Sequence, residues 1–143
     1  MVIEMKKLLC TCLSVLMLLS VGISAYAEDA SDSETMPIAV EYDQNIAGIE
    51  AQFVSSTFTC VKGNGNSLRY WFDNTAYSNC TVELYRKGIL WDTKVSSMVV
   101  SPNDPGGKSN VLKNPGNDTY YFVLYSADGG LIQGHLRANQ LNL

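Results

Sequence analysis

The sequence predicts an all-β protein built as a single antiparallel β-sandwich of seven or eight strands. After residue 27, no segment shows the 3.6-residue period of an amphipathic helix. Short runs of alternating apolar and polar residues recur along this part of the chain, and Gly, Pro, Asn and Asp separate them. The run 119–126 is dense in aromatic and β-branched residues, which is typical of a strand in a core.

The first 27 residues are typical of a secretory signal peptide. Lys6 and Lys7 form a basic start, residues 8–23 are mostly apolar, and Ala25-Tyr26-Ala27 matches the small-x-small pattern before a cleavage site. Polar residues interrupt the apolar run, which is short for a transmembrane helix of about 20 residues. We therefore expect a bacterial protein that is exported and cut after residue 27, with translation starting at Met1 or Met5.

Residues 28–45 are acidic and poor in large apolar side chains, so we expect a flexible leader there and one sandwich domain over 46–143. The chain has 10 basic and 14 acidic residues, a net charge of −4. This excess of acid is unlike a nucleic-acid-binding protein. The chain also lacks a polybasic stretch for an anionic membrane and a second apolar segment of spanning length. We expect no nucleic-acid partner and no membrane insertion of the mature chain.

The first half of the domain contains four predicted strand regions. Alternation starts at Ile46 and reaches Phe53, and strand-forming residues continue over 57–61. A Gly- and Asn-rich turn at 63–66 leads into the alternating run 68–73. The polar segment 74–79 precedes the next alternating run, 80–85.

The second half supplies the remaining strands. A tight turn at 86–88 precedes a run that opens with Ile89-Leu90-Trp91 and continues to residue 100. The segment 102–107 is the strongest breaker in the chain. Residues 111–112, 119–126 and 131–141 follow as strands, with turns at 114–117 and 128–130. We expect 119–126 to lie at the centre of the core, with Val123 buried.

The stretch 114–125, from Asn114-Pro115-Gly116 to Tyr125, resembles the turn and late strand of Ig-like and jelly-roll sandwiches, including secreted bacterial accessory domains of the pre-peptidase C-terminal type. In many of these sandwiches a Tyr near the strand start closes the corner. The resemblance implies an Ig-like or jelly-roll-like architecture. The cysteine spacing departs from the antibody pattern, so no site residue is transferred from these families.

Two cysteines remain after the signal peptide, Cys60 and Cys80. Disulfides persist outside the cytoplasm, so we expect a Cys60–Cys80 bridge. The alternative is a pair of buried free thiols. Two cysteines and the single, distant His135 do not make a tetrahedral metal site.

No catalytic residue is identified, because the chain lacks a nucleophile motif and His135 is its only histidine. We expect His135 to be a half-exposed strand residue. Asp73, Glu83 and Asp92 are expected at solvent-facing strand edges. Asn and Asp residues in the loops suit turn geometry and form no recognisable calcium loop, so we expect no metal and no cofactor. The loop residues concerned are Asn103, Asp104, Asn117, Asp118 and Asp128.

Aromatic placement is the most suggestive functional feature. Strand parity puts Trp71 on the face opposite Leu68, Tyr70 and Phe72, and Tyr85 on the face opposite its own apolar neighbours. Exposed rings can stack on a sugar or on a protein side chain. We therefore expect Trp71, Tyr85 and Trp91 to bind a ligand, most directly if they share one patch.

The resulting hypothesis is a secreted, non-enzymatic binding or adhesion-type module that acts at the cell surface or in the medium, with a cell-surface glycan or protein as partner. The alternative is a small secreted hydrolase or an enzyme inhibitor. A cleft that holds His135 with two carboxylates would favour the enzyme. The sequence does not indicate an oligomeric state.

Overall fold

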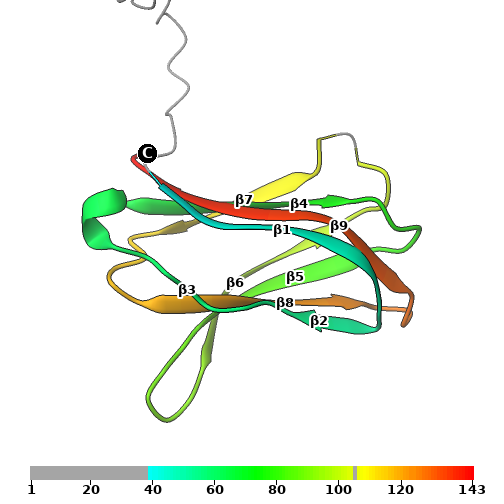
Figure 1. Cartoon of the computed structure of the whole chain (residues 1–143), viewed down its shortest axis with the longest axis horizontal. Helices are drawn as coiled ribbons and strands as arrows, with labels where there is room; N and C mark the ends of the chain where they lie inside the picture. Colours follow the sequence, from blue (N-terminus) through cyan, green and yellow to red (C-terminus); the bar gives the residue numbers. More distant parts are fainter. Residues whose placement is uncertain (1–38, 105) are drawn as a thin grey trace, which may run out of the picture. The chain divides into compact units, whose positions relative to one another are not determined.

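The computed structural model describes residues 39–104 and 106–143, which form two antiparallel sheets packed face to face (Figure 1). The expected signal peptide, 1–27, lies outside the described residues. None of the described residues forms a helix long and apolar enough to cross a membrane. The elements are β1 (Ala39–Glu50), β2 (Gln52–Val54), β3 (Phe58–Thr59), the 3₁₀ turn η1 (Lys62–Asn64), β4 (Ser67–Asn74), β5 (Cys80–Arg86), β6 (Thr93–Val100), β7 (Lys108–Lys113), β8 (Thr119–Ser126) and β9 (Leu131–Leu141).

The strand order identifies the architecture. Sheet A has the order β1-β9-β4-β7, and sheet B has the order β2-β8-β5-β6, with β3 also paired to β8. The pairs are nested: β1 with β9, then β2 and β3 with β8, then β4 with β7, then β5 with β6. A long hairpin rolled into two sheets in this way is a jelly roll. The predicted all-β sandwich is confirmed, although the described residues form nine strands instead of seven or eight. The strand order favours the jelly-roll alternative over the Ig-like one.

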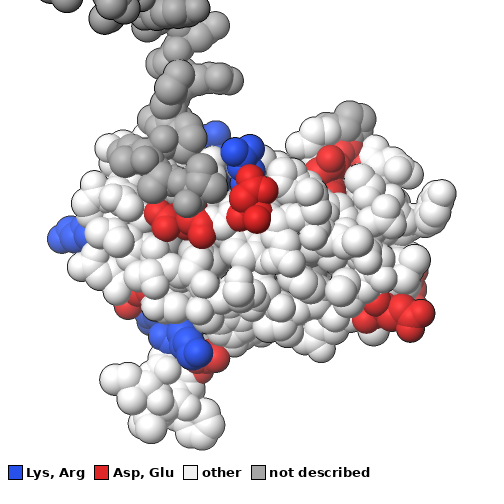
Figure 2. All heavy atoms as spheres, viewed as in Figure 1, with Lys and Arg blue, Asp and Glu red and all other residues white. Residues whose placement is uncertain are grey.

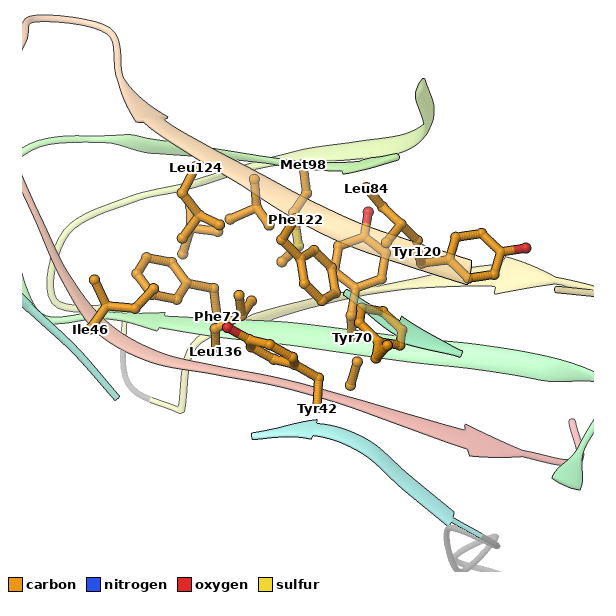
Figure 3. Packing of buried hydrophobic residues seen from close by; sticks show 14 of the residues in the cluster. Tyr42, Ile46, Tyr70, Phe72, Leu84, Met98, Tyr120, Phe122, Leu124 and Leu136 are labelled. Atoms are coloured by element: carbon orange, nitrogen blue, oxygen red, sulfur yellow. The ribbon is translucent and has the colours of Figure 1, made fainter. Parts of the chain in front are cut away.

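The core lies between the two sheets and is rich in aromatic rings. The inward residues of β4 and β5 are buried as their alternation predicts, with Tyr70 and Phe72 fully enclosed. Phe122 of sheet B has its ring centroid 5.4 Å from that of Tyr70 and 5.7 Å from that of Tyr42, which both belong to sheet A. Figure 3 shows these rings pointing toward one another across the sandwich. Their burial supplies much of the hydrophobic stabilisation.

Strand β1 begins earlier than expected, within the segment assigned to the leader. Residues 39–45 pair with β9, opposite residues 135–140, and so belong to sheet A. Tyr42 and Ile46 point into the core, whereas Asp43 and Asn45 are exposed. Because acidic side chains occupy the outer face of this edge strand, the sequence resembled a polar linker.

Two expectations were wrong, one about where a strand begins and one about which residue of a strand is buried. Ile89, Leu90 and Trp91 do not open a strand, because β6 starts only at Thr93 and the three residues lie in the loop before it. Strand β8 is central, between β5 and β2, but its buried apolar residues are Tyr120, Phe122 and Leu124. Val123 faces the other way and is only half-buried. Apolar residues occupy both faces of β8, so alternation did not identify its inner face.

The predicted tyrosine corner is present. The hydroxyl of Tyr120 donates a hydrogen bond to the backbone carbonyl of Pro115, five residues upstream. Both residues are buried. This bond ties the turn before β8 to the first residues of the strand.

Candidate functional site

The three aromatic residues predicted to bind a ligand lie in three different places. Trp71 is on the outer face of sheet A, on β4. Tyr85 is on the outer face of sheet B, on β5, and Trp91 is in the loop between β5 and β6. The outward direction predicted for Trp71 and Tyr85 is therefore correct, but the three residues do not form one patch. Their role in binding stays a prediction.

Trp71 lies in the middle of a polar surface that we call the Trp71 face. Across the four strands of sheet A, one row of paired residues runs from Asp43 through Arg137 and Trp71 to Ser109. The Arg137 guanidinium carbon lies 5.1 Å from the centre of the indole, a cation–π distance. The His135 ring meets the indole edge-on, 6.5 Å away. The face comprises Asp43, Arg69, Trp71, Asp73, Ser109, His135, Arg137 and Asn139.

Asp43 contacts both side chains that lie beside the indole, His135 and Arg137. Its Oδ1 lies 2.7 Å from His135 Nε2, and its Oδ2 lies 2.9 Å from Arg137 Nε. The hydrogen bond with His135, and then the charges of His135 and Arg137, hold the pKa of Asp43 below its ordinary value. Exposed ion pairs of this kind contribute little stability. In the structure these contacts join Arg137 and His135 to Asp43 beside Trp71.

Two open hollows flank the row that contains Trp71. The first, of about 440 Å³, is lined by Trp71 itself and by Arg69, Ser109 and Asn139, with Gly106 and Gly107 at its rim. Gly107 has φ +72, and a Cβ there would lie 2.6 Å from the carbonyl oxygen of Phe72, so only glycine fits. The rim of this hollow is therefore bare backbone.

Asn139 gives the first hollow an unused acceptor. Its Oδ1 atom is buried and has no hydrogen-bond partner among the described residues. A buried polar atom without a partner costs free energy. Because the Oδ1 atom has no accessible surface, a ligand hydroxyl relieves that cost only after the Asn139 side chain rotates toward the hollow.

The second hollow, of about 320 Å³, is on the His135 side of the row. It is lined by His135, Asp73, Thr75 and Asn45, together with backbone around Gly134. Gly134, on β9, has φ +155, and a Cβ there would come within 1.9 Å of the Asp73 carbonyl oxygen. The close approach of β9 to β4 at this point requires glycine.

Sequence reasoning missed Arg69, Arg137 and Asn139. Each alternates with core residues on its own strand and carries no motif. They approach Trp71 only because β9 pairs with β4 in a register that puts Arg137 opposite Trp71 and Asn139 opposite Arg69. The only sequence signal was the outward parity that they share with Trp71.

Tyr85 takes part in a packed cluster on the outer face of sheet B. Its ring stacks on Tyr121 with centroids 5.4 Å apart and planes inclined by 15°. Its hydroxyl donates to Glu83 over 2.9 Å, and Lys94 Nζ donates to the same carboxylate over 2.8 Å. Burial alone would raise the pKa of Glu83, but the hydrogen bonds from Lys94, Tyr85 and Tyr125 outweigh it and lower the pKa. Tyr85 therefore has a structural role, because it packs on Tyr121 and holds the Glu83 carboxylate.

The acidic residues expected at solvent-facing strand edges differ in exposure. Glu83 is buried beneath these rings, contrary to expectation, because three hydrogen-bond donors compensate its charge. Asp73 is half-buried on β4, and Asp92 is exposed in the loop before β6.

The expected Cys60–Cys80 disulfide is absent, and both residues are buried free thiols. The Cys60 amide donates to the carbonyl of Asp118 at the start of β8, whereas Cys80 pairs with Ser126 at the end of β8. Eight residues of extended strand separate these two partners, roughly 25 Å. A disulfide needs Cα atoms within about 7 Å. Burial raises the pKa of each thiol to about 12, so both are unreactive.

Two of the loop side chains, Asp128 and Asn117, make hydrogen bonds within or between turns. Asp128 accepts hydrogen bonds from the Ser126 hydroxyl and from the Gly130 amide, and these interactions, led by Ser126, lower its pKa to about 2. Asn117 Oδ1 accepts from the Lys62 amide over 2.7 Å. Within residues 39–104 and 106–143, no three His, Cys, Asp or Glu side chains come together as a metal site.

Charge is scattered over the face of the molecule that Figure 2 shows. Figure 2 shows Lys, Arg, Asp and Glu in a few separate clusters on an otherwise uncharged face. Such a surface does not form a continuous electrostatic track.

No family model matches the chain, and no curated protein matches it. Among solved structures, the chain is similar to the Yersinia pseudotuberculosis-derived mitogen, with 14% sequence identity and a TM-score of 0.47. The match covers 73% of this chain and 87% of the mitogen chain.

Proposed function

We propose that this protein is an exported binding module and that the Trp71 face binds a carbohydrate. The observation that carries the proposal is the half-buried indole of Trp71, which lines a 440 Å³ hollow at the centre of a polar sheet face. Core residues of β4 are enclosed on the other side of the same strand, so the sandwich does not need Trp71 as a core residue. Export rests on the sequence of residues 1–27.

The chemistry of the first hollow suits a sugar ring. An indole offers a flat apolar surface for the C–H groups of a pyranose, while sugar hydroxyls need nearby donors and acceptors. Arg69 and Ser109 supply donors beside the ring, and the Asn139 Oδ1 atom supplies the unused acceptor. A cell-surface or cell-wall glycan is therefore the ligand class that the site favours.

The test is Trp71→Ala, with Trp91→Ala as the matched control. We expect Trp71→Ala to abolish retention on immobilised cell-wall polysaccharide and on a glycan array. Trp91→Ala should keep it, because Trp91 lies in the β5–β6 loop on the sheet B side. Truncating a fully buried Trp costs about 3–5 kcal/mol. A half-exposed Trp71 should cost clearly less, so the thermal melt distinguishes lost binding from lost folding.

A second variant with a smaller change covers the case in which Trp71→Ala does not fold. Asn139→Ala removes the unpartnered acceptor without touching the indole, and we expect weaker glycan retention with an unchanged melt. Full glycan retention by both Trp71→Ala and Asn139→Ala would contradict the proposal. So would a parent protein that binds no glycan on the array.

The hydrolase alternative has one specific observation in its favour. His135 is paired with Asp43 over 2.7 Å, and Thr75 lines the same hollow as His135 and Asp73. A carboxylate-oriented histidine is the usual form of a general base. The check is turnover of ester, peptide and glycoside substrates by the parent protein and by His135→Ala. Equal rates for the two proteins would eliminate His135 as a base.

A further inference from the structure

The loop between β5 and β6 projects beyond the body of the sandwich, at the lower left of Figure 1. We call residues 87–92 the tip loop. Three consecutive large apolar side chains lie at its end: Ile89, Leu90 and Trp91 have relative exposures of 103%, 82% and 83%. Isolated exposed apolar residues are common, but three adjacent ones on a projection mark an interaction site.

The tip loop is held in one shape by its own hydrogen bonds. Asp92 accepts a hydrogen bond from the Gly88 amide over 3.1 Å and one from the Tyr121 hydroxyl over 2.9 Å. The Lys87 amide donates to the Thr119 carbonyl over 2.8 Å at the base of the loop. A Cβ on Gly88 would lie 2.0 Å from the Trp91 carbonyl oxygen. The loop is therefore preorganised, and binding through it requires little further ordering.

Charged side chains and two stacked tyrosine rings lie at the base of the loop, behind the apolar tip. Residues 86–94 contain three basic side chains, of which Arg86 is paired with Asp118 over 3.7 Å and Lys94 with Glu83 over 2.8 Å, whereas Lys87 has no ion pair among the described residues. In Figure 2 the projection at the lower left is uncharged at its end, with Lys or Arg atoms and Asp or Glu atoms next to one another at its base. The stacked rings of Tyr85, on β5, and Tyr121, on the neighbouring strand β8, lie beside the base of the loop.

We infer that the tip loop inserts into the surface of a phospholipid bilayer that carries anionic headgroups. Apolar residues with an interfacial Trp belong at the boundary between acyl chains and headgroups, and Lys and Arg belong at the headgroup level. Lys87, which makes no ion pair in the part of the chain that the structure describes, is the basic side chain left to contact anionic lipid. The convex tip needs no pocket in its partner, which suits a lipid surface.

This inference revises the expectation that the mature chain does not insert into membranes. That expectation rested on the lack of a spanning segment and of a polybasic stretch, and it treated Ile89, Leu90 and Trp91 as part of a strand. A three-residue tip contacts one leaflet only and does not span. The inferred membrane contact is independent of the Trp71 face.

The test uses the fluorescence of Trp91. The chain has two Trp residues, so Trp71→Phe leaves Trp91 as the only indole. With vesicles of phosphatidylcholine and a minor fraction of phosphatidylglycerol, we expect Trp91 emission to shift to shorter wavelength and to be quenched by brominated lipid. Vesicles of phosphatidylcholine alone should bind more weakly. These lipids carry no sugar, so the result does not depend on the proposed glycan site.

Leu90→Asp should reduce vesicle binding about tenfold or more, because it replaces an inserted apolar side chain by a charge. The matched control is Tyr77→Asp, which puts the same charge at a residue that is 93% exposed in the loop between β4 and β5. Tyr77→Asp should bind like the parent protein. Because all variants share one N-terminus, any difference between them arises from the substituted residue.

Unchanged Trp91 emission at saturating lipid would overturn the inference, whatever the behaviour of Leu90→Asp. Equal vesicle binding by Leu90→Asp and the parent would also overturn it. Equal binding to vesicles with and without phosphatidylglycerol would overturn the assignment of anionic headgroups to the basic residues at the base of the loop.

Discussion

Replacing Tyr120 by Phe tests how much the tyrosine corner stabilises this fold. The change removes one hydroxyl, which donates to the Pro115 carbonyl inside the protein, and leaves the buried ring in place. A hydrogen bond contributes about 0.5–1.5 kcal/mol, and an unpartnered buried carbonyl costs about 1–3 kcal/mol. We expect Tyr120→Phe to lower the free energy of unfolding by about 2 kcal/mol. In a domain of about 100 residues this lowers Tm by about 10 °C.

The neighbouring residue supplies the control. The Tyr121 hydroxyl donates to the exposed Asp92 carboxylate, so Tyr121→Phe should change the free energy of unfolding by less than about 0.5 kcal/mol. Urea unfolding of both variants gives the two values directly, and the slope with urea should match that of the parent. Equal stability losses in the two variants would refute the argument that burial makes the Tyr120 bond valuable.

The pH dependence of the corner has a definite sign. Burial raises the pKa of Tyr120 to about 12. Unfolded chains release the phenolic proton near pH 10, so the stabilisation is complete below pH 10 and is lost as the pH rises from there toward 12. The stability gap between parent and Tyr120→Phe should therefore be constant from neutral pH to pH 9.

Three further predictions follow from the packing. Gly134→Ala should destabilise the fold by about 3 kcal/mol or more, because its Cβ would overlap the Asp73 carbonyl, and thermal melting measures the loss. Both Cys60 and Cys80 should react with a thiol reagent after unfolding without reductant. If neither reacts, the two cysteines form the disulfide after all. The pKa of Glu83 is lowered in the folded protein, so its contribution to stability is present above the ordinary glutamate pKa and is lost as the pH falls below it. Glu83→Gln should therefore make the free energy of unfolding depend less on pH in the acid range.

Sequence alternation was a good guide where only one face of a strand is apolar. Leu68, Tyr70 and Phe72 alternate with Arg69, Trp71 and Asp73, and the structure buries the first set and turns the second outward. On β8 the rule failed because Tyr, Phe, Val and Leu occupy successive positions. Packing against the facing sheet then decides which residues point inward.

Long-range register could not be read from the chain. Cys60 and Cys80 are only 20 positions apart in number, but β4 crosses to the other sheet between them, and they return to opposite ends of β8. The register between β4 and β9 likewise brings Arg137 and Asn139 close to Trp71. Pairing across a sheet depends on the whole topology, and one sequence does not encode it in a local pattern.

The first and last strands have a mechanical consequence. Ala39, at the start of β1, lies opposite Gln140, near the end of β9, so both ends of the pair emerge at one corner of sheet A (Figure 1). A pulling force between these two ends would open the β1–β9 hydrogen bonds one after another, as in a zipper. A load that entered through a ligand on Trp71 would reach β4 instead, which has a paired strand on each side and would share the force among many bonds at once.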